Sequence, residues 1–262
     1  MPTDKMIARR EASIGWMIFN NPDKLNAVSM EMWTAALDIM ADFRADPSIR
    51  VVVLAGEGGR AFVSGADISK FKDERQQADA LAAYQATTER FYSQLQAMPM
   101  PTLAMIRGYC IGGGTAIAVC CDLRICTQGA RFGVPAAKLG LGYGMTRAKP
   151  LVDLVGPSFA MEMLFTGRQF TAEEARAMGL VNRIVADDAL EPTVSELARQ
   201  IADNAPLTVR TAKMVVRELI KDAGDRDVAA CDAAVAACFA SADYREGQAA
   251  FVEKRKPVFS GR

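Results

Sequence analysis

The stretch GYCIGGGTAIAVCCD, residues 108–122, places three consecutive glycines between two apolar segments. Glycine weakens a helix or strand by roughly 0.5–1 kcal/mol relative to alanine, so three together indicate a backbone geometry that side chains would obstruct. The preceding TLAMIRG has the length of a strand, and the following TAIAVCC is compatible with a helix. The stretch therefore predicts a strand-to-helix junction whose unpaired N–H groups are open to an oxygen atom. A tight turn packed against a neighbouring element is the alternative.

A second turn of small residues lies in AFVSGADISKF, residues 61–71, directly after VVVLAGEGGR, which reads as a buried strand ended by glycines. Residues 64–67 read SGAD and lead into an expected helix, so this turn also offers backbone N–H groups to an anion. Two converging N–H groups form an oxyanion hole, which stabilises the carbonyl oxygen of an ester or thioester as it gains negative charge. The two turns together therefore favour chemistry on such a carbonyl.

The composition fits a soluble globular protein with one large domain, or one domain and an appendage. The 262 residues are 50% hydrophobic and 24% charged, and Lys+Arg and Asp+Glu both number 31. A net charge of zero argues against broad attraction to nucleic acid or to an anionic membrane. The chain contains no apolar run of the roughly 18–20 residues that a membrane span needs, and its first residues lack the apolar core of a secretory signal. We therefore expect a cytoplasmic protein.

The sequence contains no histidine, which removes Ser-His and Cys-His nucleophiles and His-ligated zinc. The six cysteines form no CxxC pair and are interpreted as buried free thiols rather than metal ligands or disulfides: Cys110, Cys120, Cys121, Cys126, Cys231 and Cys238. We therefore expect no metal. Catalysis has to use carboxylates, tyrosine, lysine, hydroxyls, backbone amides or a cofactor.

Strand-like and helix-like segments alternate over the first half of the chain, which is typical of an α/β fold. Thr171 and Glu174 have the spacing of a capping box and predict the start of a helix. From Asp188 onward the pattern becomes helical. We therefore expect an α/β core over residues 1–200 and a helical region over residues 201–262.

Several motifs occur in order along nearly the whole chain: KLNAVS (24–29), AFVSGADI (61–68), GYCIGGGTAIAVCCDLRIC (108–126), RFGVPAAKLGLG (131–142), LFTGRQFTAEEARAMGLVNRIV (164–185) and EGQAAFVEKRKPVF (246–259). Together they resemble the crotonase, or enoyl-CoA hydratase/isomerase, superfamily. The resemblance implies a spiral of ββα units with a C-terminal all-α trimerisation region. It also implies a homotrimer or dimer of trimers that binds an acyl-CoA substrate and uses no further cofactor.

The same resemblance implies roles for individual residues. The amides of Ser64 and Gly113 would form the oxyanion hole. Residues at the coenzyme A site would be Lys24, Leu25, Ala27, Ala66, Asp67 and Ile68, while Phe251 and Lys254 would reach the coenzyme A of a neighbouring subunit. Each has a plainer alternative, since such lysines are commonly solvated surface residues, Asp67 could be a charge at a helix N-terminus, and Phe251 could be core.

The chain departs from the family at the two glutamates of the hydratases, whose positions are Ala116 and Ala136. Each positioned proton-transfer group typically contributes a factor of roughly 10²–10⁴ to the rate, so ordinary hydration should be crippled. The isomerase branch usually keeps the second glutamate, so double-bond migration by that route is not expected either. Loss of CO₂ from a malonyl-type thioester needs an oxyanion hole but no carboxylate base, and a carboxylate there would repel the departing one.

KLGLGYG supplies Tyr143, and the methylmalonyl-CoA decarboxylase branch is similar in having a tyrosine here and no glutamate at the second site. A protonated phenol could bind the carboxylate or deliver a proton, and the alternative is a lid over the acyl pocket. That branch can keep the first glutamate, which is Ala116 here. Three hypotheses follow: an acyl-CoA decarboxylase, an atypical hydratase or isomerase in which Tyr143 or Asp67 replaces the glutamates, and a catalytically silent acyl-CoA-binding homologue.

Overall fold

Pairs of strands followed by a helix recur along the chain. The computed structural model describes residues 3–67 and 78–262. The first unit is β3 (Val51–Gly56), β4 (Ala61–Val63) and α3 (Ala78–Gln96), and the second is β5 (Thr102–Ile106), β6 (Tyr109–Ile111) and α4 (Gly113–Cys120). The third pairs β7 (Leu123–Thr127) with β8 (Arg131–Gly133) and leads through η3 (Pro135–Leu139) to α5 (Met145–Thr166). The repetition places similar strand-to-helix turns near one another.

The strands divide between two sheets. Six form the main sheet in the order β1-β2-β3-β5-β7-β10, and four form the second in the order β4-β6-β8-β9. The strands outside the three units are β1 (Met6–Glu11), β2 (Ile14–Phe19), β9 (Phe170–Thr171) and β10 (Arg183–Val185). The main sheet is parallel apart from the β1–β2 hairpin. Each unit gives its first strand to one sheet and its second to the other, which confirms the expected α/β spiral of ββα units.

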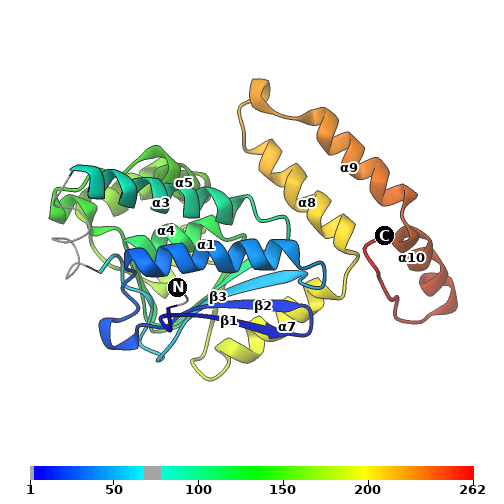
Figure 1. The fold of residues 1–262 in the computed structure, drawn as a ribbon, viewed down its shortest axis with the longest axis horizontal. Coiled ribbons are helices and arrows are strands. Elements are labelled where there is room, and N and C mark those ends of the chain that lie inside the picture. Colours follow the sequence, from blue (N-terminus) through cyan, green and yellow to red (C-terminus); the bar gives the residue numbers. More distant parts are fainter. Residues whose placement is uncertain (1–2, 68–77) are drawn as a thin grey trace.

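The main sheet is covered on both faces, which is why its central strands read as continuous apolar runs. Figure 1 shows α1 (Met30–Ala45), α3 and α5 on one side and α7 (Leu190–Ala202) on the other. Alternate residues of β2 point to opposite faces of the sheet. Met17 packs in the core under α1, whereas Trp16 packs in the cluster that contains Val194 of α7. The two glycine turns lie in the layer that contains α1, α3 and α5.

The last three helices are α8 (Pro206–Leu219), α9 (Val228–Ala240) and α10 (Ala242–Glu253), and they extend away from the two sheets in Figure 1. The helix before them, α7, runs past the boundary expected at residue 200, and Ala202 still belongs to the core cluster. Shorter elements complete the chain: η1 (Pro22–Lys24), α6 (Ala172–Ala177), whose capping box of Thr171 and Glu174 is formed as predicted, and η4 (Ala223–Asp225). Within the described residues, no helix has the length and apolar character needed to cross a bilayer.

One partly buried charge cluster joins α8 to the core. The Asp122 carboxylate lies 2.7 Å from Lys213 Nζ and 2.9 Å from Arg217 Nη2, and it also accepts a hydrogen bond of 2.8 Å from the Thr102 amide. Burial raises the pKa of Asp122, but the two positive charges and the amide outweigh burial and hold the pKa below its ordinary value. The cluster therefore favours an ionised Asp122 and fixes the start of the helical region against the sheet.

Candidate active site

The three glycines have three separate structural reasons. Gly112 has a φ of +57°, which favours glycine over any residue with a side chain. A β-carbon on Gly114 would lie 2.0 Å from the Val63 carbonyl oxygen, so α4 could not approach β4 with any other residue there. Gly113 has room for a β-carbon, but this residue is the first of α4 and lines a cavity. Its bare backbone therefore leaves an unpaired helix N–H open to that cavity.

Both ends of α4 are held by buried polar contacts. At the N-terminal end the Gly112 amide donates to the Gly133 carbonyl at 2.7 Å, and the Thr115 hydroxyl donates to the Cys110 carbonyl at 2.6 Å. At the C-terminal end the buried Arg124 guanidinium donates to the Cys121 carbonyl at 2.6 Å, where its positive charge complements the helix dipole. The position of the Gly113 amide is therefore fixed by the surrounding backbone.

The second turn pairs with the loop that follows η1, and this pairing decides which of its amides is available. The Ser64 amide donates to the Leu25 carbonyl at 3.1 Å, and the Asp67 amide donates to the Val28 carbonyl at 3.0 Å. The Ala66 amide, which lies between them, donates to no other described residue. The available N–H therefore belongs to Ala66, whereas the sequence analysis assigned the role to Ser64.

Gly65 brings the two turns together. A β-carbon on Gly113 would lie 3.6 Å from the Gly65 Cα and 3.7 Å from its carbonyl carbon, the atom to which the Ala66 nitrogen is bonded. Gly65 itself has a φ of +120°, which only glycine adopts readily. The amides of Ala66 and Gly113 are therefore neighbours in the cavity wall, as an oxyanion hole requires.

The loop expected at the coenzyme A site packs directly against this turn. Leu25 and Asn26 both have left-handed backbones, and the buried Asn26 side chain donates to the carbonyls of Glu57 at 2.9 Å and Ala61 at 2.8 Å. Lys24 Nζ lies 2.9 Å from the buried Asp67 carboxylate, while 47% of the Lys24 side chain stays exposed.

The remaining residues of that prediction have different surroundings. Ala27 is buried beside the loop, and its amide donates to the Lys24 carbonyl at 3.0 Å. Ile68 lies outside the described residues. The structure therefore brings Lys24, Leu25 and Ala27 to the turn that carries Ala66 and Asp67.

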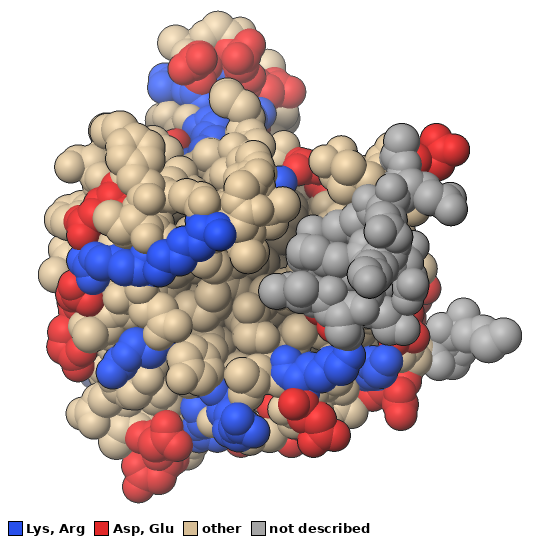
Figure 2. Space-filling view, turned by 90° about the vertical axis from the view of Figure 1, so that its left-hand side faces the viewer, with Lys and Arg blue, Asp and Glu red and all other residues tan. Residues whose placement is uncertain are grey.

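A cavity of about 360 Å³ opens at the two amides, and its wall comes from the turns, α3, η3 and the start of α5. Among the described residues that line it, none is an aspartate or a glutamate, and the polar side chains are Ser64, Tyr84, Gln85, Thr88, Tyr92, Tyr143 and Arg147. Figure 2 shows a recess of uncharged atoms beside the grey segment, with Lys and Arg side chains along its border. Such a border favours an anionic ligand.

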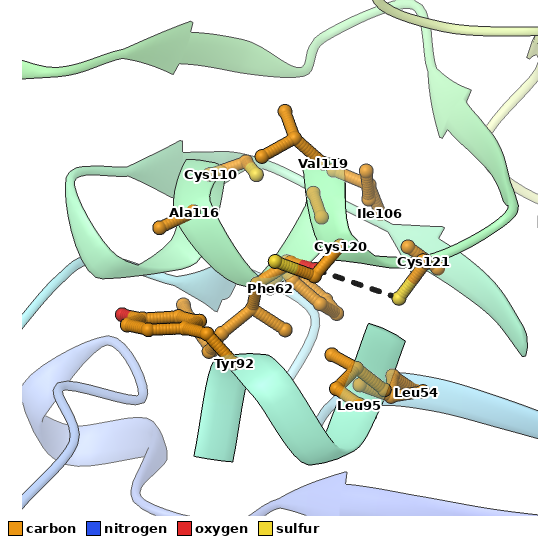
Figure 3. Close-up of a cluster of buried hydrophobic side chains, with 14 of the residues drawn as sticks. Leu54, Phe62, Tyr92, Leu95, Ile106, Cys110, Ala116, Val119, Cys120 and Cys121 are labelled. Carbon is orange, nitrogen blue, oxygen red and sulfur yellow. Dashed lines mark hydrogen bonds between the residues drawn. The ribbon is translucent and has the colours of Figure 1, made fainter. Parts of the chain in front are cut away.

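The two alanines that stand in place of glutamates have different surroundings. Ala136 lines the cavity, whereas Ala116 is fully buried one turn after Gly113 on α4. In Figure 3 the hydroxyl end of Tyr92 lies on the same side of α4 as the Ala116 methyl group. The Tyr92 hydroxyl is 3.8 Å from the β-carbon position of Gly113, so a phenol stands close to the amide pair.

Tyr143 and Arg147 form another polar part of the wall. The Tyr143 hydroxyl is buried and has no hydrogen-bond partner among the described residues. Burial raises the pKa of Tyr143 well above its usual range, although the nearby Arg147 charge opposes this, so the phenol is protonated at neutral pH. The Arg147 guanidinium carbon lies 5.1 Å from the centre of the Tyr143 ring.

Sequence reasoning overlooked Tyr92 and Arg147. Tyr92 sits on α3, whose spacing resembles that of any core helix. Arg147 carried a usable signal, because a cation in the first turn of a helix opposes the dipole and needs another explanation. The convergence of both side chains on the glycine turns comes from tertiary packing.

Four of the six cysteines surround α4, and they are buried and free: Cys110, Cys120, Cys121 and Cys126. Burial raises the pKa of Cys121 and Cys126 to about 12, so these groups are neutral thiols at neutral pH. The dashed line in Figure 3 marks the hydrogen bond of 3.5 Å from the Cys121 thiol to the Ile117 carbonyl. In the described part of the chain, no three acidic or cysteine side chains converge as metal ligands would.

Phe251 and Lys254 lie at the far end of the helical region and do not line the cavity. Phe251 is 86% exposed and lines an apolar groove of about 890 Å³ together with Phe239 and Tyr244. Lys254 ends α10 with a left-handed backbone. Neither residue therefore contributes to the site of its own chain.

The fold and the paired amides define an enzyme of the crotonase type, and comparisons with known proteins agree. The family model described as enoyl-CoA hydratase/isomerase matches residues 9–262. The crotonyl-CoA hydratase of Syntrophomonas wolfei is 33% identical over 99% of both chains, and the 2,3-dehydroadipyl-CoA hydratase of Escherichia coli is 30% identical over 98% of this chain and 99% of its own. A crystal structure from Magnetospirillum magneticum, described as an enoyl-CoA hydratase/carnithine racemase, covers 100% of this chain and 97% of its own, with 36% identity and a TM-score of 0.92. The chain belongs to the enoyl-CoA hydratase/isomerase family and is a crotonase-family acyl-CoA enzyme.

Proposed function

We propose that this enzyme decarboxylates a malonyl-type acyl-CoA and stabilises the resulting thioester enolate with the amides of Ala66 and Gly113. The observation that carries the proposal is the cavity at this amide pair, whose described lining offers hydroxyls and one guanidinium but no carboxylate. Hydration and isomerisation need a base to move a proton, whereas decarboxylation generates the enolate without one. The wall therefore suits the loss of CO₂ better than the removal of a proton.

In the proposed reaction the bond between Cα and the carboxylate breaks, and its electron pair passes into the thioester enolate while CO₂ leaves. The developing negative charge on the thioester oxygen is stabilised by the two N–H groups, whose geometry is set by backbone alone. The Tyr143 phenol then donates its proton to Cα, and water reprotonates the phenolate. The raised pKa of Tyr143 keeps that proton in place until the enolate forms.

A second candidate is hydration of an enoyl-CoA, because curated relatives at 30–33% identity carry the names of enoyl-CoA hydratases. This chain would then need other groups in place of the two glutamates. Asp67 is committed to Lys24 at 2.9 Å, and Tyr143 is protonated at neutral pH, so neither supplies a ready base. The geometry therefore favours decarboxylation over this candidate.

We also infer that the helical region carries the contact between copies of the chain, in a homotrimer or dimer of trimers. The apolar groove between α8, α9 and α10 is lined by Phe239, Tyr244 and Phe251, and such large exposed apolar patches mark protein interfaces. The family resemblance implies that Phe251 and Lys254 then reach the coenzyme A of a neighbouring subunit, and neither lines the cavity of its own chain.

The first experiment incubates the purified protein with a mixed panel of enoyl-CoA and alkylmalonyl-CoA thioesters and follows the mass of every component. Loss of CO₂ from a malonyl-type member supports the proposal, and Tyr143→Phe should then abolish it. Gain of water on an enoyl member supports the second candidate. Binding without turnover across the whole panel would identify a silent acyl-CoA-binding homologue and overturn both.

A further inference from the structure

Arg147 occupies a position that helix stability does not explain. It lies in the first turn of α5, where its amide donates to the Gly144 carbonyl at 3.2 Å and no acidic residue is present. A cation at a helix N-terminus typically costs about 0.3–1 kcal/mol because it opposes the dipole. Its acidic neighbour is Glu89 of α3, whose carboxylate lies 3.7 Å from Arg147 Nε, a separation too long for a hydrogen bond.

The Arg147 side chain also has an unpaired donor at the cavity. Arg147 lines the cavity, and its buried Nε has no hydrogen-bond partner among the described residues. The Tyr143 hydroxyl on the same wall is also buried and unpartnered. Leaving buried polar groups unpaired costs free energy, so two such groups side by side indicate a ligand that satisfies both.

We propose that Arg147 binds a carboxylate carried by the acyl group of the substrate, and that it selects acidic acyl groups over neutral ones. A guanidinium offers a planar fork of N–H donors that matches a carboxylate bidentately, and the Tyr143 hydroxyl can donate beside it. This inference rests on the proposed function only in placing an acyl-CoA in this cavity. It does not depend on which bond the enzyme breaks.

Glu89 acts as the counterion of Arg147 in the free enzyme. The Arg147 and Glu89 side chains are 30% and 38% exposed, and pairs of this kind contribute little, typically about 0–1 kcal/mol. A substrate carboxylate that enters the cavity therefore replaces or joins Glu89 at small cost. The ion pair therefore leaves the site open to an acidic acyl group.

The test compares binding of two matched pairs of thioesters, measured by stopped flow before any turnover. Methylmalonyl-CoA and isobutyryl-CoA differ in that the first carries a carboxylate where the second has a methyl group, and succinyl-CoA and butyryl-CoA differ in the same way. The wild type should bind the acidic member of at least one pair about 10–100-fold more tightly, as expected for a charge-assisted hydrogen bond. Arg147→Met should remove this preference, and Arg147→Lys should keep part of it.

Glu89→Gln provides the matched variant, because it removes the competing carboxylate and should tighten binding of the acidic thioester. A purely structural role of the ion pair would instead weaken binding in both single variants. The inference is overturned if the wild type prefers neither acidic member, or if the preference survives in Arg147→Met. Preference without CO₂ release would refute the decarboxylase proposal and leave the carboxylate site intact, so the two failures are distinguishable.

Discussion

The Cα of Gly65 lies 3.6 Å from the point at which a β-carbon on Gly113 would sit. Two turns that are about 48 positions apart in the sequence thus meet backbone to backbone, with their free amides in one cavity wall. Because both donors are main-chain groups, side-chain truncation cannot remove them, and only a change in backbone access can test them.

Neighbouring glycines of α4 should respond differently to alanine. Gly113→Ala should fold, because its nearest contacts are ordinary, but its methyl group should crowd the oxyanion and lower kcat by about 10²–10³-fold. Gly114→Ala should instead lose thermal stability, since its methyl group would lie 2.0 Å from the Val63 carbonyl oxygen. Thermal melts and steady-state kinetics on both variants check this, and near-normal kcat in Gly113→Ala would remove that amide from the mechanism.

Tyr92→Phe should lower kcat by about 10–100-fold with a smaller effect on KM, because the lost hydroxyl stands beside the developing oxyanion. Burial raises the pKa of Tyr92 well above its usual range, so the phenol is a donor throughout the physiological range and its loss should not shift the pH profile below pH 9. Tyr109→Phe is the control, since Tyr109 is 41% exposed and lies outside the cavity. Equal kcat values for both variants would contradict a role for Tyr92.

Asp122→Asn should lower the free energy of unfolding by about 1–3 kcal/mol, because it leaves the partly buried Lys213 and Arg217 charges without their counterion. The folded pKa of Asp122 lies below its unfolded value, so its contribution is complete above the unfolded pKa of about 3.9 and is lost as the pH falls through the folded pKa. The difference between wild type and variant should therefore be constant from pH 5 to pH 8 and shrink below about pH 4. Urea melts across this range measure it, and a difference that grows on acidification would refute the assignment.

Phe251→Asp should dissociate the assembled protein, because it places a charge in the apolar groove of the helical region. Sedimentation velocity over a dilution series would show the smaller species. Val252→Asp serves as the control, since Val252 is 79% exposed and lies outside that groove. A wild type that sediments as a monomer at all concentrations would end the proposal of a trimer.

The sequence predicted the parts of the fold that depend on local pattern. The apolar run of β3, the junction at Gly112 and the capping box at Thr171 all appear as expected, because neighbouring residues specify them. The available amide of the second turn was assigned to Ser64, and this was wrong because the pairing with Leu25, 39 positions earlier, occupies that amide. Local pattern does not carry such long-range partners.

The sequence also did not predict which side chains converge on the cavity. Tyr92 and Arg147 come from separate helices, and nothing in their own segments points to a common target. Tyr143 was found only because it stands in a motif with a known resemblance. Its unpartnered hydroxyl, which gives the residue chemical meaning, became visible with the packing around it.

Rigid anchoring of α4 also bears on how such enzymes diversify. The helix is tied at Thr115 and at Arg124, so the position of the Gly113 amide belongs to the scaffold. In the proposed function, proton transfer instead depends on a side chain, Tyr143, that takes no part in these hydrogen bonds. Substitution of such a side chain could therefore change the reaction while the backbone donors stay in place.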